Sequence, residues 1–300
     1  MVERPATGAR GHDLRTVEHI TVPTEGHEGH DAVIGRMIAG IERLEGVAGG
    51  SGRVASVGVA VPGLIDMVEG VTFFLPNLPG MWREVPVGRK IREATGYRTS
   101  LINDVRAFTV GELELGAAKG YETALCYAVG TGIGGGVITH GRVHFGLGGA
   151  AGELGHMVVD PQGPRCGCGN RGCAETVASG TAVVAAARRA GLDASDAESV
   201  FMAEAGGDPR AAAAVRRFVA GLVATVVNAI HAYQPAIVVL TGGIMAGADR
   251  FLPQVCSEVA ERAWTVPRGR VRVEPSRLGA SAGVLAGAAV SYGSRTERCP

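Results

Sequence analysis

The sequence contains almost no lysine, since only Lys90 and Lys119 are lysines among its 300 residues. A P-loop requires Gly-Lys-Ser/Thr after a glycine-rich loop, and neither lysine stands in such a sequence, which excludes this nucleotide site. The chain also lacks an excess of charge of either sign, with 29 basic and 29 acidic side chains. We therefore expect neither nucleic acid nor a membrane as a partner, and a small neutral or anionic ligand instead.

Long apolar runs are also lacking. The uncharged run near the C-terminus, residues 278–294, is rich in Gly, Ala and Ser and falls short of the ~20 strongly apolar residues of a membrane span. Residues 1–11 carry charge and have no apolar centre, so they do not have the pattern of a secretory signal. We expect a cytoplasmic protein.

The composition is that of a folded chain, with 46% hydrophobic and 19% charged residues. Because single cores stop growing near about 250–300 residues, a chain of 300 residues is expected to have two lobes. Glycine is abundant, 47 residues, and it clusters in loops instead of recurring at every third position. Those loops indicate turns or close approach to a ligand.

Apolar periodicity predicts alternating strands and helices, which favours an α/β fold with mixed sheets. The predicted strands are 15–22, 54–61, 99–102, 123–129, 137–139, 236–240 and 271–274. The predicted helices are 31–44, 87–95, 105–115, 182–190, 199–205, 211–233, 251–263 and 281–291.

The segment 130–136 contains five glycines and matches the Gly-x-Gly-x-x-Gly dinucleotide fingerprint. That fingerprint requires a helix after the loop, whereas Val137–Thr139 is β-like. We therefore predict a β-hairpin whose glycines and Thr131 donate hydrogen bonds to a phosphate. The alternative is a tight glycine turn without a ligand.

One histidine and three cysteines lie within eighteen residues, in the order His156, Cys166, Cys168 and Cys173. One imidazole and three thiolates form a closed tetrahedral set that suits structural Zn²⁺. A disulfide or a loop of free thiols is the alternative. Glu153 and Glu175 flank this cluster, and carboxylates held rigidly there would suit the recognition of sugar hydroxyls; surface carboxylates are the other interpretation.

Asn103-Asp104 stands where a predicted strand ends and a helix begins. Asp104 is there either an N-cap or a general base at the carboxyl end of a strand.

With these motifs the chain resembles the ROK (repressor, open reading frame, kinase) family of sugar kinases and sugar-responsive repressors over about residues 15–290. The matching stretches are 59–66 (VAVPGLID), 76–78 (PNL), 103–104 (ND) with 111–112 (GE), 129–137 (VGTGIGGGV), 149–156 (GAAGELGH), 166–179 (CGCGNRGCAETVAS) and 239–244 (VLTGGI). The family is similar in fold to actin-like ATPases, two α/β lobes around a cleft in which ATP and hexose meet.

The resemblance implies an ATP-dependent hexose kinase that acts on the 6-hydroxyl of glucose or a related hexose, with Asp104 as general base. The implied sugar ligands are Asn77, Asn103, Glu153, His156 and Glu175. Gly130, Thr131, Gly132, Gly134, Gly242 and Gly243 would face ATP and its Mg²⁺, and His156, Cys166, Cys168 and Cys173 would bind structural Zn²⁺. The resemblance further implies a homodimer or homotetramer.

Two departures from the family pattern leave alternatives open. The first phosphate loop, Asp-x-Gly-Gly-Thr, has no match, so we expect the first strand to be missing and keep a non-catalytic sugar-binding pseudokinase as an alternative. Position 106, usually a small amide, is Arg106, close to the proposed base. An N-acetylmannosamine or N-acetylglucosamine kinase is the alternative in substrate. The expected lobes are residues 1–115, with a C-terminal helix at about 283–298 packing back on them, and residues 116–282 with the glycine and zinc loops.

Overall fold

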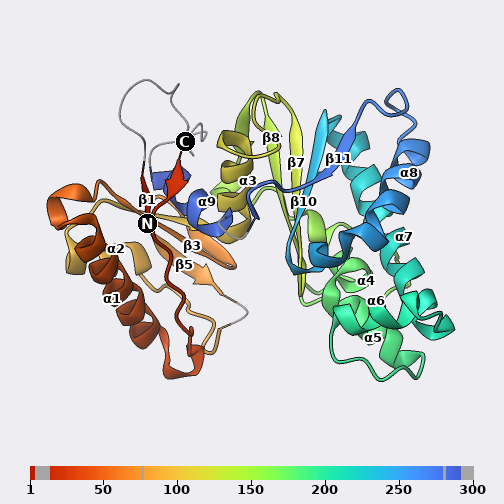
Figure 1. Ribbon diagram of the computed structural model, residues 1–300, viewed down its shortest axis with the longest axis horizontal. Helices are drawn as coiled ribbons and strands as arrows, with labels where there is room; N and C mark the ends of the chain where they lie inside the picture. The colour runs from red at the N-terminus through yellow and green to blue at the C-terminus, as the bar shows by residue number, and fades with distance from the viewer. Residues whose placement is uncertain (4–13, 76–77, 280–281, 292–300) are drawn as a thin grey trace. The chain divides into compact units, whose positions relative to one another are not determined.

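The computed structural model describes residues 1–3, 14–75, 78–279 and 282–291 (Figure 1). The chain forms two compact units. Unit 1 comprises residues 1–120, 141–151 and 277–300, and unit 2 comprises residues 121–140 and 152–276. The predicted lobes, residues 1–115 and 116–282, do not include the return of the chain to unit 1 at residues 141–151. The division into these two lobes stays a prediction.

Unit 1 is built around two parallel strands, β3 (Val57–Val61) and β6 (Thr99–Asn103), with Val61 opposite Asn103. Residues 2–3 pair with residues 15–16 as two short antiparallel strands. Of the predicted strand 15–22, only residues 15–16 are therefore in a strand. The other elements of unit 1 are β1 (Val2–Glu3), β2 (Arg15–Thr16), η1 (Gly26–Glu28), α1 (His30–Ala48), η2 (Ser51–Arg53), β4 (Leu64–Asp66), β5 (Val71–Phe74), α2 (Val87–Thr95), α3 (Asp104–Glu114), β9 (Arg142–His144), η3 (Leu147–Gly149) and α9 (Ala282–Ser291).

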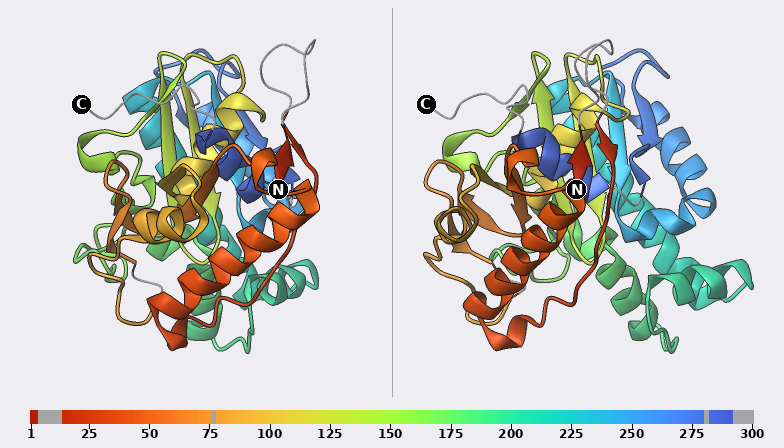
Figure 2. Two further views of the ribbon diagram at one scale, coloured as in Figure 1. Left: turned by 90° about the vertical axis from the view of Figure 1, so that its left-hand side faces the viewer. Right: turned by 60° about the vertical axis from the view of Figure 1, so that its left-hand side comes forward.

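The helices of unit 1 pack as the apolar periodicity requires. Helix α1 lies beside α2, as Figures 1 and 2 show, and buries Val33 and Ile34 in the core of the unit. Helix α9 packs against α3 and β3, although it is more than 160 residues away from either in the sequence. The predicted 281–291 helix is thus confirmed over 282–291, and it belongs to unit 1.

Unit 2 contains a mixed sheet with the strand order β11-β10-β7-β8, which confirms the predicted mixed α/β class. Strands β10 and β11 are parallel to each other and to β7, and β8 is antiparallel to β7. The bounds are β7 (Ala124–Val129), β8 (Ile133–Thr139), β10 (Ile237–Thr241) and β11 (Arg272–Pro275), with helices α4 (Glu175–Ala178), α5 (Gly180–Arg189), α6 (Ala197–Ala205), α7 (Pro209–Tyr233) and α8 (Leu252–Arg262) and the short helices η4 (Leu154–His156) and η5 (Gly243–Arg250).

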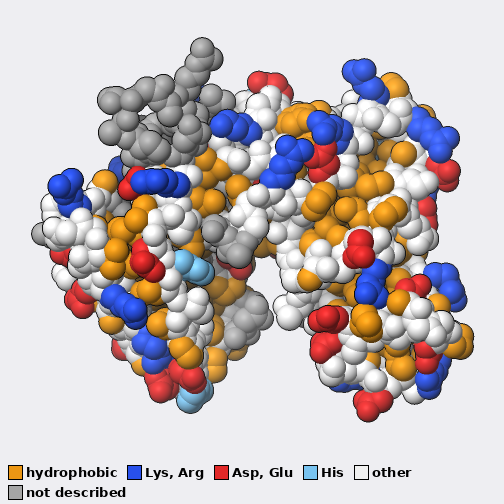
Figure 3. Space-filling view, viewed as in Figure 1, with side chains coloured by type: hydrophobic (Ala, Val, Ile, Leu, Met, Phe, Trp, Pro, Cys, Tyr) orange, Lys and Arg blue, Asp and Glu red, His pale blue; other side chains and the backbone are white. Residues whose placement is uncertain are grey.

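Helix α7 is the central helix of unit 2 and packs against α4, α5, α6 and α8. It is long and apolar enough to cross a membrane by length and composition, but 67% of its apolar window is buried within the structure. That burial is what a core helix of a globular unit requires. The surface itself carries interspersed acidic and basic side chains over the described residues that face the viewer in Figure 3.

The glycine segment forms the predicted β-hairpin, but its turn is shorter than the sequence indicated. Strand β8 begins at Ile133, so Gly134 pairs with Ala128 inside the ladder and only residues 130–132 connect the strands. Gly135 lies in the same strand, where a Cβ atom would stand 2.6 Å from the carbonyl oxygen of Gly152 and from the Leu154 side chain. Close packing therefore explains this glycine without a phosphate.

Candidate active site and metal centre

The predicted metal ligands of unit 2 come together. The Nδ1 or Nε2 atom of His156 and the Sγ atoms of Cys166, Cys168 and Cys173 lie within 4.8 Å of one another. Backbone hydrogen bonds between residues close in sequence fold the loop. The Cys166 amide donates to the Asn170 carbonyl at 2.8 Å, and the Gly169 amide donates to the Cys166 carbonyl at 3.0 Å. The described cysteines form no disulfide, which leaves the disulfide alternative without support in the residues described.

Two distances test whether these four atoms fit zinc. The Nδ1 atom of His156 is 3.5 Å from Cys166 Sγ, and Cys168 Sγ is 3.6 Å from Cys173 Sγ. In a tetrahedral site with Zn–S of about 2.3 Å and Zn–N of about 2.0 Å, neighbouring ligand atoms are separated by roughly 3.5–3.8 Å. These two of the six edges match that tetrahedron, and the four donor atoms together lie within 4.8 Å, so the donor set suits zinc in chemistry and is close to its spacing.

The surroundings of the three thiols do not favour the thiolate form at all three positions. Burial raises the pKa of both Cys166 and Cys173, whereas hydrogen bonding by the Asn170 backbone amide, the largest cause, lowers the pKa of Cys168 to about 7. The surroundings alone thus favour the protonated thiol over the thiolate at Cys166 and Cys173. A bound cation is what would hold all three as thiolates.

The two carboxylates beside the cluster face the same imidazole. An oxygen of Glu153 lies 3.8 Å from His156 Nε2, and an oxygen of Glu175 lies 3.5 Å from His156 Nδ1. Glu175 also accepts from the Cys166 thiol at 3.0 Å, and a Cβ atom on Gly132 would stand 2.9 Å from its other oxygen. The zinc loop, the glycine hairpin and both carboxylates therefore meet at one place in unit 2.

The N-terminus of α3 in unit 1 assigns different roles to Asn103 and Asp104. Asn103 is the N-cap, because its side-chain oxygen accepts from the backbone amides of Val105 at 3.0 Å and Arg106 at 3.1 Å. Asp104 is the first residue of the helix and is exposed. Of the two interpretations from the sequence, the N-cap thus belongs to Asn103, while one oxygen of Asp104 accepts from the Val105 amide at 2.9 Å.

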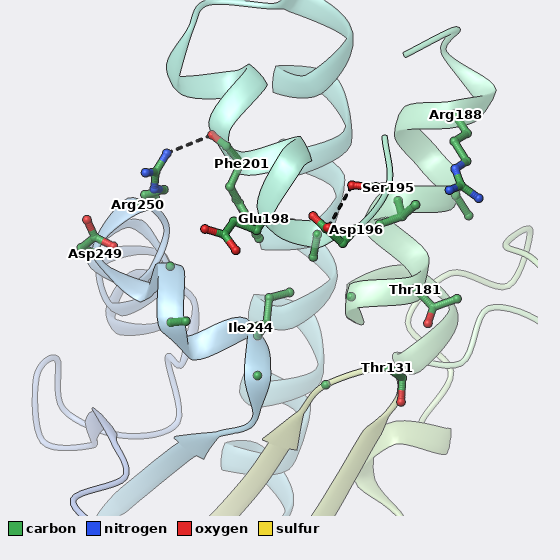
Figure 4. A pocket seen from close by; sticks show the side chains of 18 of the residues that line it. Thr131, Thr181, Arg188, Ser195, Asp196, Glu198, Phe201, Ile244, Asp249 and Arg250 are labelled. Atoms are coloured by element: carbon green, nitrogen blue, oxygen red, sulfur yellow. Dashed lines mark hydrogen bonds between the residues drawn. The ribbon is translucent and has the colours of Figure 1, made fainter. Parts of the chain in front are cut away.

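A cavity of about 1150 Å³ lies in unit 2 between the glycine hairpin, one face of α5 along its length, the first turns of α6, and η5 (Figure 4). Gly130, Thr131 and Gly243 line it, as predicted for residues that face a nucleotide. Gly132, Gly134 and Gly242 are predicted residues that do not line it. The volume lies slightly above the range of about 300–1,000 Å³ that is usual for small-molecule pockets, so it is large enough for a nucleotide.

The far end of this cavity has side chains that no sequence motif indicated. Figure 4 shows Glu198 and Phe201 from α6 and Arg250 from η5, whose guanidinium donates to the Phe201 carbonyl at 3.1 Å. These residues belong to two elements that lie far apart in the sequence, so only the fold brings them together. Among the predicted sugar ligands, Asn77 lies outside the described residues.

The fold and these sites define a sugar kinase of the actin-like ATPase class. Among solved structures, a ROK hexokinase from Thermus thermophilus is similar to this chain with a TM-score of 0.81 and 35% identity, covering 91% of this chain and 89% of that one. A ROK family glucokinase from Streptomyces griseus, solved in complex with glucose and AMPPNP, matches with a TM-score of 0.74 and 26% identity, covering 87% of this chain and 88% of that one.

The chain belongs to the ROK family, whose model matches residues 11–292. It is 34% identical to a glucokinase of Thermotoga maritima over 95% of this chain and 93% of the relative. It is 31% identical to an N-acetylmannosamine kinase of Citrobacter koseri over 94% of this chain and 93% of the relative. The family resemblance predicted from the motifs is therefore confirmed.

Proposed function

We propose that this protein is an ATP-dependent hexose kinase that phosphorylates the 6-hydroxyl of glucose or a related hexose. The observation that carries this proposal is the similarity to a glucokinase over nearly the whole length of both chains. The cavity of unit 2, with Gly130 and Thr131 at one end, supports it as the place for ATP. Phosphoryl transfer depends mainly on positioning and on electrostatic stabilisation, and Mg²⁺ bound to ATP would neutralise charge that develops on the phosphates.

In this proposal Asp104 is the general base. Its carboxylate accepts the proton of the hexose 6-hydroxyl as that oxygen attacks the γ-phosphorus of ATP, and ADP leaves with the electrons of the broken P–O bond. Asn103 as N-cap fixes the backbone that carries Asp104. Hexose binding is assigned to Asn77, Asn103, Glu153, His156 and Glu175.

The cysteine cluster has an orienting role in the proposal. His156, Cys166, Cys168 and Cys173 would hold structural Zn²⁺, which supplies a fixed point for the loop and no open coordination position. With Nδ1 directed to the cluster, the imidazole carries its proton on Nε2, and this N–H donates a hydrogen bond to a sugar hydroxyl. Glu153, 3.8 Å from Nε2, accepts from a neighbouring hydroxyl. The reduced thiols of such a site suit a cytoplasmic location.

The proposal is tested by ADP release from Mg-ATP with glucose, mannose, N-acetylglucosamine and N-acetylmannosamine. We expect the highest kcat/KM on glucose or mannose. The similarity to an N-acetylmannosamine kinase makes the N-acetylhexosamines the second candidate class. Hexose binding by calorimetry without turnover on any of the four sugars would indicate the pseudokinase alternative, and sedimentation analysis tests the proposed homodimer or homotetramer.

A further inference from the structure

Arg106 is a charged side chain in the interior of unit 1, with only 2% of its surface exposed. It follows Asp104 by two positions in the first turn of α3. Burying a guanidinium is costly unless its N–H groups have acceptors. The acceptors of the Arg106 guanidinium therefore indicate which parts of unit 1 this side chain holds in place.

One branch of the guanidinium binds the N-cap. Nη1 of Arg106 donates to Asn103 Oδ1 at 3.2 Å, and Asn103 Nδ2 donates to the Gly63 carbonyl at 3.0 Å. The same Oδ1 also accepts the two backbone amides of the helix cap, so it has three donors in all. These contacts fix the amide orientation and leave Asn103 with one remaining N–H.

The other branch binds the glycine-rich segment that precedes Glu153. Nη2 of Arg106 donates to the Ala150 carbonyl at 3.2 Å. The segment is closed by the Ala151 amide, which donates to the Phe145 carbonyl at 2.8 Å. Ala150 stands three residues before Glu153 in the chain. One planar side chain thus holds both the N-cap next to Asp104 and the backbone leading to another predicted sugar ligand.

We propose that Arg106 is a positioning residue for hexose binding, which fixes the Asn103 amide so that it offers one N–H donor to a sugar hydroxyl and which anchors residues 145–151. This inference rests on the proposed function, because it assumes that Asn103 meets the hexose. Asn103 donates to the sugar and accepts nothing from it, so the hydroxyl at this position acts as an acceptor toward Asn103.

The fork of arginine is essential to this role. Lysine keeps the charge but is a single point donor that cannot reach two acceptors in fixed planar geometry, and methionine keeps much of the aliphatic volume without donors. A hydrogen bond from a charged donor contributes enough for about a 10- to 100-fold effect on an equilibrium. We expect Arg106→Met to raise the glucose KM and Kd about 10- to 100-fold, and Arg106→Lys to fall between it and the wild type.

The experiment measures the glucose KM, the ATP KM and kcat, together with glucose Kd by calorimetry without ATP. A positioning role raises the glucose KM and Kd while the ATP KM stays within about twofold. Arg98→Met is the matched control, because Arg98 is also in unit 1 and donates to the Ser291 backbone carbonyl at 2.6 Å. Unchanged glucose constants in Arg106→Met, or equal rises in both KM values that follow a loss of thermal stability, would overturn the proposal.

A second variant pair isolates the Asn103 amide. Asn103→Asp keeps an oxygen for helix capping and removes the N–H. We expect Arg106→Met to raise glucose Kd by a smaller factor in the Asn103→Asp background than in the wild type, because the donor to be positioned is already gone and only the anchoring of residues 145–151 is still lost. A full additional effect there would contradict the proposal.

The outcomes also separate this inference from the proposed function. A wild-type protein that binds glucose without turning it over would refute the kinase proposal, while the effect of Arg106 on Kd still tests the positioning role. Turnover by the wild type with unaffected Arg106 variants would refute the positioning role alone. A wild-type protein that binds no hexose would overturn both.

Discussion

His156 Nδ1 lies 3.5 Å from Cys166 Sγ, so the imidazole directs one nitrogen to the cysteine cluster while Nε2 faces Glu153. Because a metal at Nδ1 fixes the tautomer and the orientation of the ring, metal content and hexose affinity are expected to change together. We predict one zinc per chain by elemental analysis. Cys168→Ser is expected to lose the zinc and to raise the glucose KM roughly 10- to 100-fold.

Cys256→Ser is the control for this experiment, since Cys256 lies in α8 and donates to the Val273 carbonyl at 3.6 Å, away from the cluster. It should retain zinc and the wild-type glucose KM. Absence of stoichiometric zinc from protein purified without chelators would contradict the metal assignment.

Removal of the proposed base should reduce turnover and leave the fold intact. Asn103 caps α3, so Asp104→Asn removes a carboxylate without removing the cap. A positioned general base contributes about 10²–10⁴ in rate, and we predict a fall of that size in kcat with glucose Kd within a few-fold of wild type. A variant that keeps more than a tenth of wild-type kcat would refute the assignment of Asp104.

A methyl group on the glycine hairpin should disturb a carboxylate of the sugar site. The Cβ atom of Gly132→Ala would stand 2.9 Å from Glu175 Oε2, so the carboxylate has to move. We predict a glucose KM raised several-fold with little loss of thermal stability. Gly206→Ala, where a Cβ atom would make ordinary contact at 3.4 Å, is the control and should behave as the wild type. An unchanged glucose KM in Gly132→Ala would count against Glu175 as a sugar ligand.

The cap of α7 predicts how acid affects stability. Asp208 accepts hydrogen bonds from the amides of Arg210 and Ala211 and pairs with the Arg210 side chain, and the side-chain hydrogen bond to Arg210 is the largest cause that lowers its pKa. A carboxyl group whose pKa is lower in the folded than in the unfolded state stabilises above its unfolded value near 4 and loses that effect as pH falls.

Asp208→Asn keeps a good capping side chain but removes the charge. Its melting temperature should therefore lie below that of the wild type at pH 7, and the difference should shrink progressively as the pH falls below about 4. Because Asp208 is only half-buried and its partner Arg210 is exposed, the difference should shrink in high salt. A difference that grows on acidification would contradict this reading of the carboxylate.

Much of the fold was predictable because apolar periodicity reports directly on local structure. The helix at 87–95 was predicted with its observed bounds, and α3, α7 and β7 within two residues. The glycine hairpin was predicted as a hairpin but with a longer turn. Three of the seven residues of strand β8 are glycine, a residue whose own preference is not for strands. Pairing with β7 and packing against residues 152–154 therefore decide its structure.

The sequence by itself determined the family, the α/β class and the His-Cys donor set, since each depends on residue types at short spacing. Tertiary structure alone decided which of two adjacent residues caps α3, how far apart the four donor atoms lie, and which dispersed side chains line the cavity of unit 2. It also decided that Arg106 is buried with its fork on Asn103 and Ala150. The physical reason is that hydrogen-bond partners and burial join residues 44 positions apart, a separation about which local spacing carries no information.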